Sequence, residues 1–136
     1  MVKKELSVSV IMPTFEINKS EDALRDIFKQ NYPLNEVIVI NDNPNSEIPR
    51  SMLKFMKDNK IKLIKNHVNM GAAKSINEGI LASKSDVIIV VCRDHFMESN
   101  AWIRHIVEKL SSDKKIGLVS CPYVWPTNAW RSYNFL

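Results

Sequence analysis

The chain has 136 residues, which is enough for one domain with its own core and too short for two ordinary domains. Hydrophobic residues make up 45% and charged residues 25%, as in soluble globular proteins and unlike disordered, collagen-like or disulfide-rich chains. The net charge is +4, no apolar run is long enough to span a membrane, and no signal peptide is recognisable, so we expect a cytoplasmic protein.

The first part of the chain is predicted to alternate between strands and helices. Residues 6–12 alternate and then become apolar, which is typical of a strand, and residues 23–28 show helical spacing after Lys19 or Ser20. The Glu-Val-Ile-Val-Ile run at 36–40 is typical of a strand buried on both faces. Asn and Pro residues at 41–45 predict a turn, and a helix is expected to begin at Ser46.

The segment from 50 to 67 is strongly basic, with six Lys or Arg residues and one acidic residue. We interpret it as the solvated surface of a helix and the strand that follows. A positive field that attracts a phosphorylated ligand is the alternative. Because the segment lacks the repeated aromatic residues of a base-stacking platform, nucleic acid is not an expected partner.

The second part of the chain continues the alternation. Strands are expected at 61–65, 86–92 and 115–120, and helices at 72–80 and 102–110. Cys92 and Cys121 lie in strand-like runs, and we interpret them as buried free thiols. Buried strands that are each linked by a helix predict a mostly parallel sheet in a three-layer α/β/α sandwich.

The last part of the chain is rich in aromatic residues, and we divide the chain into an α/β domain at 1–121 and a tail at 122–136. The tail holds five of the eleven aromatic residues. So apolar a segment has to pack on its own domain, on a second copy, on an acceptor substrate or on a continuation of the fold. A homo-oligomer formed through the tail is one of these open alternatives.

Polar residues follow each expected strand, at the edge where open parallel sheets bind ligands. Asp94 is flanked by Arg93 and His95 after six apolar residues, a combination that suits a metal or phosphate site, with a structural salt bridge as the alternative. The chain has no Gly-x-Gly-x-x-Gly fingerprint, no Gly-Lys-Ser/Thr phosphate loop, no Cys-x-x-Cys pair and no recognisable Ser/His/Asp spacing.

Several segments, in this order, resemble the family 2 glycosyltransferases with the GT-A fold. The matching segments are Val-Ser-Val-Ile-Met-Pro-Thr-Phe-Glu at 8–16, Gln-x-Tyr-Pro at 30–33, the strand and turn at 36–43, the Asn-x-Gly segment at 69–80, and Cys-Arg-Asp at 92–94. The resemblance implies a truncated GT-A fold that transfers a sugar, with inversion, from a nucleoside-diphosphate-sugar donor to an acceptor hydroxyl. A non-catalytic nucleotide-sugar-binding module is the alternative, and the acceptor is not identified.

The same resemblance implies a role for individual residues. The donor nucleotide is expected along Pro13, Thr14, Phe15 and Glu16, with the Phe15 ring against the base and Asp42 accepting a hydrogen bond from a uracil-like base edge. The ribose and phosphates are expected near Asn69, Gly71, Lys74 and Arg93. Asp94 and His95 are expected to hold a divalent cation, Mn²⁺ or Mg²⁺, that bridges the diphosphate.

The chain also departs from the family pattern. Asn41 replaces the first residue of the usual acidic pair, and Cys92 replaces the first aspartate of the Asp-x-Asp motif. Two alternatives compensate for the lost aspartate: His95 adds a metal ligand, or Arg93 supplies positive charge that a metal otherwise supplies. The family's general base lies downstream in its acceptor half, so no catalytic residue is assigned here.

Overall fold

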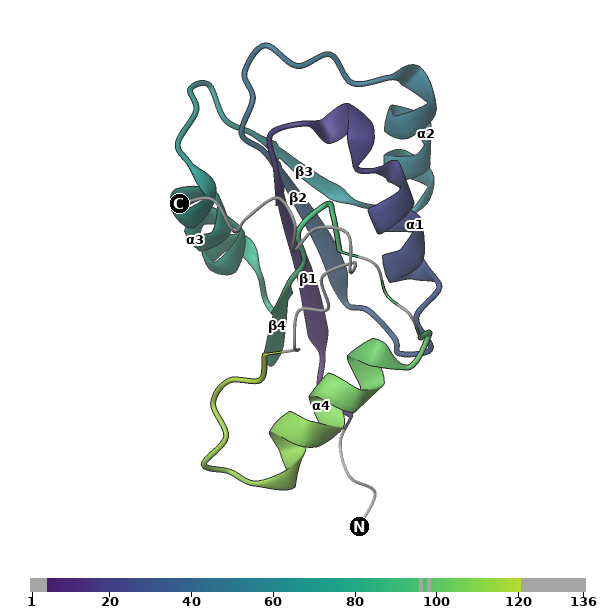
Figure 1. Ribbon diagram of the computed structural model, residues 1–136, viewed down its shortest axis with the longest axis vertical. Coiled ribbons are helices and arrows are strands. Elements are labelled where there is room, and N and C mark those ends of the chain that lie inside the picture. The colour runs from purple at the N-terminus through teal and green to yellow at the C-terminus, as the bar shows by residue number, and fades with distance from the viewer. Residues whose placement is uncertain (1–4, 96, 98, 121–136) are drawn as a thin grey trace, which may run out of the picture.

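The structure is a computed structural model that describes residues 5–95, 97 and 99–120, and its elements alternate as expected (Figure 1). In chain order they are β1 (Val8–Thr14), a short 3₁₀ helix η1 (Ile17–Lys19), α1 (Glu21–Phe28), β2 (Glu36–Asn41), α2 (Arg50–Asp58), β3 (Lys62–Lys65), α3 (Ala72–Ala82), β4 (Val87–Val90) and α4 (Trp102–Ser112). Ser20 is the N-cap residue of α1, which confirms the expected start of that helix.

The four strands form one parallel sheet in the order β3-β2-β1-β4. The chain builds from β1 outward through β2 to β3, and then returns to place β4 on the other side of β1. The strand order therefore reverses between β1 and β4, which is where open α/β sheets leave a crevice at the carboxyl ends of their strands.

Helices cover both faces of this sheet, so the predicted three-layer sandwich is confirmed. In Figure 1, α1 and α2 lie on one side and α3 lies on the other. Ile103 and Val107 of α4 belong to the same apolar cluster as the buried residues of α1 and α2. The α3 face has a smaller cluster, centred on Ile11, Ile38 and Ile40.

Pro13 shows how the crevice between β1 and β4 is kept open. Ile11 accepts a backbone hydrogen bond from Val91 N at 2.9 Å, so odd-numbered residues of β1 face β4. Pro13 has the same orientation and is paired with β2 opposite Ile40, but it lies beyond the residues of β1 that pair with β4. Because proline has no N–H to donate, its place in a central strand is tolerated where the neighbouring strand has ended.

Three expectations about the elements were wrong. Residues 115–120 do not form a strand: the chain turns at Asp113, whose side chain accepts from Lys115 N at 2.9 Å, and Leu118 is 81% exposed. The helix expected from Ser46 begins instead at Arg50, because Pro49 disfavours helical geometry in the residue before it. Cys92 is exposed and follows the end of β4, so it is not a buried strand thiol.

The aromatic segment 122–136 lies outside the described residues, as does Cys121. Among the residues that are described, no helix has the length and apolar character needed to cross a bilayer.

Candidate functional site

Two polar segments meet at the crevice between β1 and β4. Glu16 follows β1, and Arg93 follows β4, 77 positions later in the sequence. The Arg93 guanidinium donates to Glu16 Oε2, and Lys19 Nζ donates to Glu16 Oε1 at 2.5 Å. One carboxylate therefore holds two cations at the point where the strand order reverses.

The charges around Glu16 also set its ionisation. The hydrogen bond from Lys19 is the largest influence, and together with the positive charge of Arg93 it lowers the pKa of Glu16 despite partial desolvation. Glu16 is thus an anion at neutral pH. Both ion pairs are partly exposed to solvent, so an incoming anion has access to the two cations.

Phe15 lies between β1 and Glu16, and its side chain is 50% exposed. An exposed aromatic ring at the carboxyl edge of a sheet offers a flat apolar surface, such as a nucleobase stacks on. Thr14 differs, since it is buried and its hydroxyl is 3.0 Å from the hydroxyl of Ser20. Thr14 thus anchors the start of α1, and Pro13 belongs to the strand itself.

Asp42, directly after β2, is buried and holds the loop that precedes α3. Its Oδ1 accepts from Asn66 Nδ2 and Met70 N, and its Oδ2 accepts from Gly71 N, each at 2.8 Å. Burial raises the pKa of this carboxyl, but the hydrogen bonds from Asn66, Met70 and Gly71 outweigh it and lower the pKa below the usual value. The carboxylate stays ionised inside the protein.

The hydrogen bonds to the Asp42 carboxylate limit its expected role in base recognition. A carboxylate oxygen accepts about two hydrogen bonds, so Oδ1 is saturated by Asn66 and Met70, while Oδ2 accepts from Gly71. The Ser75 hydroxyl is a further hydrogen-bonding group that lowers the pKa of this carboxyl. With 6% of the residue exposed, access to the carboxylate is narrow. Base recognition by Asp42 stays a prediction, whereas its structural role in the loop is evident from these contacts.

The segment before α3 brings Asn69, Gly71 and Lys74 to the same edge of the sheet. Gly71 has a positive φ of 82° and is the N-cap residue of α3; its N–H is shared between Asp42 and Asn69 Oδ1, which is 3.0 Å away. Lys74 is exposed on the first turn of α3, and in the described part of the chain it makes no hydrogen bond or ion pair. Its ammonium group is available to an external anion.

Residues 92–95 form a tight turn after β4. His95 N donates to Cys92 O at 3.2 Å, and Cys92 N donates to His95 Nδ1 at 2.8 Å. Between them, Asp94 is exposed. One potential metal-ligand atom from each of Cys92, Asp94 and His95 lies within 4.8 Å of the other two. Desolvation of the thiol, and then the negative charge of Asp94, raise the pKa of Cys92.

The structure therefore groups the expected site residues into three neighbouring sets at the carboxyl edge: the pair Glu16 and Arg93, the loop around Asp42, and the turn containing Asp94 and His95. Sequence reasoning did not assign Lys19 or Cys92 to the site. Lys19 was detectable as a base three positions after Glu16, and Cys92 by its spacing to the acid and imidazole that follow it.

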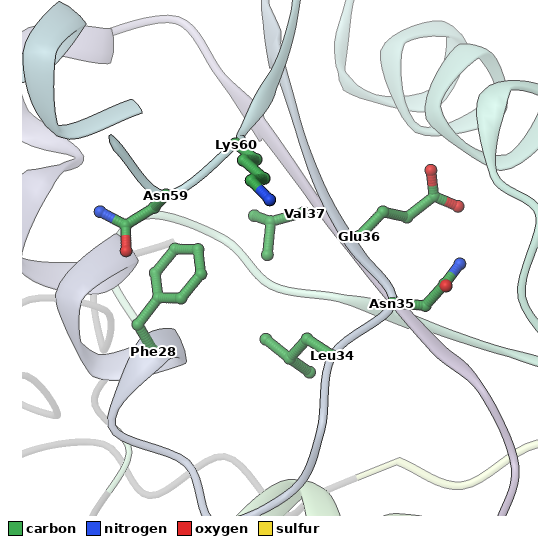
Figure 2. A pocket seen from close by; sticks show the side chains of 7 residues that line it. All are labelled: Phe28, Leu34, Asn35, Glu36, Val37, Asn59 and Lys60. Atoms are coloured by element: carbon green, nitrogen blue, oxygen red, sulfur yellow. The ribbon is translucent and has the colours of Figure 1, made fainter. Parts of the chain in front are cut away.

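The described residues also line a hollow of about 150 Å³, which Figure 2 shows among Phe28, Leu34, Glu36, Lys60 and their neighbours. Glu36 is the first residue of β2, so this hollow lies at the amino end of the sheet. It is at the opposite end from Glu16, Asp42 and Arg93. The charged residues at the carboxyl edge remain the better candidate site, because that edge coincides with the reversal of strand order.

Comparison with known proteins identifies the family to which the chain belongs. A family model described as "Glycosyl transferase family 2" matches residues 9–134. A poly-beta-1,6-N-acetyl-D-glucosamine synthase of Staphylococcus epidermidis is 27% identical over 106 residues, which are 76% of this chain and 26% of that protein. A synthase of the same name from Staphylococcus aureus is 25% identical over 105 residues. The chain thus spans about a quarter of the length of the curated relatives it matches.

Two solved structures share the fold of the chain. A mannosyltransferase from Pyrobaculum calidifontis, in complex with GDP-Man and Mn²⁺, superposes with a TM-score of 0.77 at 22% identity over 88% of this chain and 36% of that one. A glucosyl-3-phosphoglycerate synthase from Mycobacterium tuberculosis, in complex with Mn²⁺, UDP and phosphoglyceric acid, gives a TM-score of 0.60 at 13% identity, over 82% of this chain and 41% of that one. At these identities the likeness concerns the GT-A fold.

Proposed function

Because the chain belongs to glycosyl transferase family 2, we propose that it binds a nucleoside-diphosphate-sugar donor and serves the transfer of the sugar, with inversion, to an acceptor hydroxyl. The observation that carries the proposal is the meeting of Glu16 and Arg93 between β1 and β4, beside the exposed ring of Phe15. A ring for a base and a cation for a diphosphate are the two features that this class of donor requires.

The geometry suggests how the donor would be held. The base would lie against Phe15, and the diphosphate would take the place of the Glu16 carboxylate on Arg93 and Lys19. Arginine suits this exchange because its planar guanidinium binds phosphate with two parallel hydrogen bonds. Lys74, on the first turn of α3, would add a further positive charge at the same edge.

In the transfer step, the bond between the anomeric carbon and the diphosphate oxygen breaks, while the acceptor oxygen bonds to that carbon and loses its proton to a base. Negative charge grows on the departing diphosphate, and fixed cations such as Arg93 stabilise it there. No described residue is assigned as the general base. The proposal therefore concerns donor binding and leaving-group stabilisation by the chain's own residues.

A divalent cation is a further part of the expected site, with Asp94 and His95 as its ligands. Mn²⁺ and Mg²⁺ are hard ions that prefer several oxygen ligands. The turn offers one carboxylate, from Asp94, beside a thiol and an imidazole. These donor atoms fit a hard cation poorly, so the proposed stabilisation of the diphosphate is assigned to Arg93 and not to a metal ion.

A non-catalytic nucleotide-sugar-binding module is the second candidate. It is favoured by one observation, namely that Cys92 stands where the family's Asp-x-Asp motif has its first aspartate. Both candidates require donor binding, and they differ in whether the donor is consumed.

Thermal unfolding with a panel of UDP-, GDP- and dTDP-sugars tests the proposal, because a ligand that binds the native state raises its apparent stability. We expect at least one donor to stabilise the chain. Arg93→Ala should weaken that donor's affinity about tenfold or more, the usual effect of removing a hydrogen bond to a charged group. Arg50→Ala, at an exposed position of α2, is the matched control and should bind normally.

Failure of every donor to stabilise the chain would overturn both candidates. Donor binding without hydrolysis or transfer would favour the binding module. Equal loss of affinity in Arg93→Ala and Arg50→Ala would refute the assignment of Arg93 and leave only general electrostatic attraction.

A further inference from the structure

The turn after β4 has a chemistry of its own. We propose that Cys92, Asp94 and His95 bind a divalent transition-metal ion of the Zn²⁺ class in preference to Mn²⁺ or Mg²⁺, the juxtaposition of a thiol, a carboxylate and an imidazole being the observation that points to it. The inference deepens the proposed function by naming the class of cation at the same site. The role of the metal ion in the site rests on the proposed function, whereas metal binding itself does not.

The ligand atoms are close enough to share one ion. Zn²⁺ binds sulfur at about 2.3 Å and nitrogen or oxygen at about 2.0–2.2 Å, so ligands of one tetrahedral ion lie roughly 3–4 Å apart. The three atoms here lie within 4.8 Å of one another. Cys92 and Asp94 are exposed, so their side chains have room to rotate toward a shared ion beside the half-buried His95.

The types of ligand decide which ion is preferred. Thiolate and imidazole favour Zn²⁺, Co²⁺ and similar ions, whereas Mg²⁺ and Mn²⁺ are best served by carboxylate, carbonyl and water oxygens. The turn supplies a thiol and an imidazole, but only one carboxylate. Arg93, which lies within the turn, donates to Glu16, so that carboxylate is already engaged and is not counted among the ligands.

Metal binding also requires two local changes in the turn. The Cys92 thiol gives up its proton as the metal–sulfur bond forms, and the released proton passes to solvent. His95 Nδ1 accepts from Cys92 N at 2.8 Å, so a metal bound at Nδ1 displaces that N–H. The second hydrogen bond of the turn, from His95 N to Cys92 O, remains to hold the ligands together.

Three protein ligands leave a fourth tetrahedral position open. Open positions of this kind are characteristic of zinc sites that take a water or substrate oxygen. The turn directly follows β4, at the crevice where we place the donor diphosphate. A water molecule is the ligand expected in the open position, because the diphosphate itself is assigned to Arg93 and Lys19.

Titration of the intact chain with Co²⁺ tests the proposal without any donor, because cobalt bound to a thiolate gives a sulfur-to-metal charge-transfer band in the near ultraviolet. We expect this band to appear and to be removed by Zn²⁺ but not by an equal concentration of Mn²⁺. Competition should give a Zn²⁺ affinity at least tenfold higher than the Mn²⁺ affinity.

Matched variants assign the ligands. Cys92→Ser should abolish the charge-transfer band and lower Zn²⁺ affinity at least tenfold, whereas Cys121→Ser should keep both. His95→Ala should weaken Zn²⁺ binding, and His105→Ala, on the exposed side of α4, should not. Circular dichroism establishes that each variant is folded. In the NMR spectrum, the amide of Cys92 should shift when Zn²⁺ binds, because it loses its acceptor.

Several results would overturn the proposal: no cobalt band, equal affinity for Zn²⁺ and Mn²⁺, or a band that survives Cys92→Ser. Donor binding is measured separately in the presence of a chelator. Donor binding without a cobalt band refutes only the metal site, while a cobalt band without binding of any donor refutes only the proposed function.

Discussion

The buried carboxylate of Asp42 gives a sharp test of how the candidate site is held together. Replacing it by asparagine keeps the shape but turns one oxygen into an NH₂ group that cannot accept. With the amide nitrogen in the position of Oδ1, both Asn66 Nδ2 and Met70 N lose their acceptor. With the nitrogen in the position of Oδ2, only Gly71 N loses a partner, and it keeps Asn69 Oδ1 at 3.0 Å.

The second arrangement costs less, and its energetic cost can be estimated. One charge-assisted hydrogen bond contributes about 1.5–3 kcal/mol, so Asp42→Asn should lower the free energy of unfolding by roughly 2–3 kcal/mol at pH 7. Asp58→Asn is the matched control: this residue pairs with Lys54 on the exposed surface of α2, and the change should stay below about 1 kcal/mol. Urea unfolding followed by circular dichroism measures both values.

The pH dependence provides an independent check of the same reasoning. The pKa of Asp42 in the folded chain lies below the value of about 3.9 expected for an unfolded aspartate, so its ionisation stabilises the fold at neutral pH. This contribution is complete above the unfolded pKa and is lost as the pH falls through the folded pKa. The stability gap between the wild type and Asp42→Asn should therefore narrow below about pH 4. A gap below about 0.5 kcal/mol at pH 7, or one that stays constant down to pH 3, would refute the role of the ionised carboxylate.

Three further predictions follow from individual contacts. Gly79→Ala places a Cβ 2.5 Å from Ile11 Cγ2 and 2.8 Å from Ile40 Cδ1. Overpacking of about 1–3 kcal/mol should exceed the roughly 1 kcal/mol by which a helix prefers alanine to glycine, so the urea midpoint should fall. Gly117→Ala, with open space around it, is the control and should leave the midpoint unchanged. Gly71→Ala forces a φ of 82° on an L-residue, which should cost about 1–2 kcal/mol and appear as a lower thermal midpoint. Glu16→Gln removes the charge that competes for Arg93 and Lys19, so calorimetry should detect tighter donor binding, and weaker binding would mean that Glu16 itself contacts the donor.

The local features of the fold were readable in the sequence because they depend on neighbouring residues. The apolar run at 36–40 became β2, a strand buried on nearly every residue, since such a run is suited to a sheet covered on both faces. The helical spacing of apolar residues at 23–28 correctly predicted α1, because it places the apolar side chains on one face of the helix. The strand expected at 115–120 did not form, because strand formation depends on tertiary packing as well as on the apolar character of the segment.

In the candidate site, too, some features depend on the local sequence and others on the tertiary structure. Its residue types and their positions after strands were readable in the sequence alone, as were the family resemblance and the candidate metal ligands Asp94 and His95. Only the tertiary structure decided that Glu16 and Arg93 form an ion pair, because these residues are 77 positions apart and meet only when β4 is added beside β1. It also decided that Asp42 is first of all a buried acceptor for the loop before α3. Burial and long-range hydrogen bonds arise from packing, which no local pattern specifies.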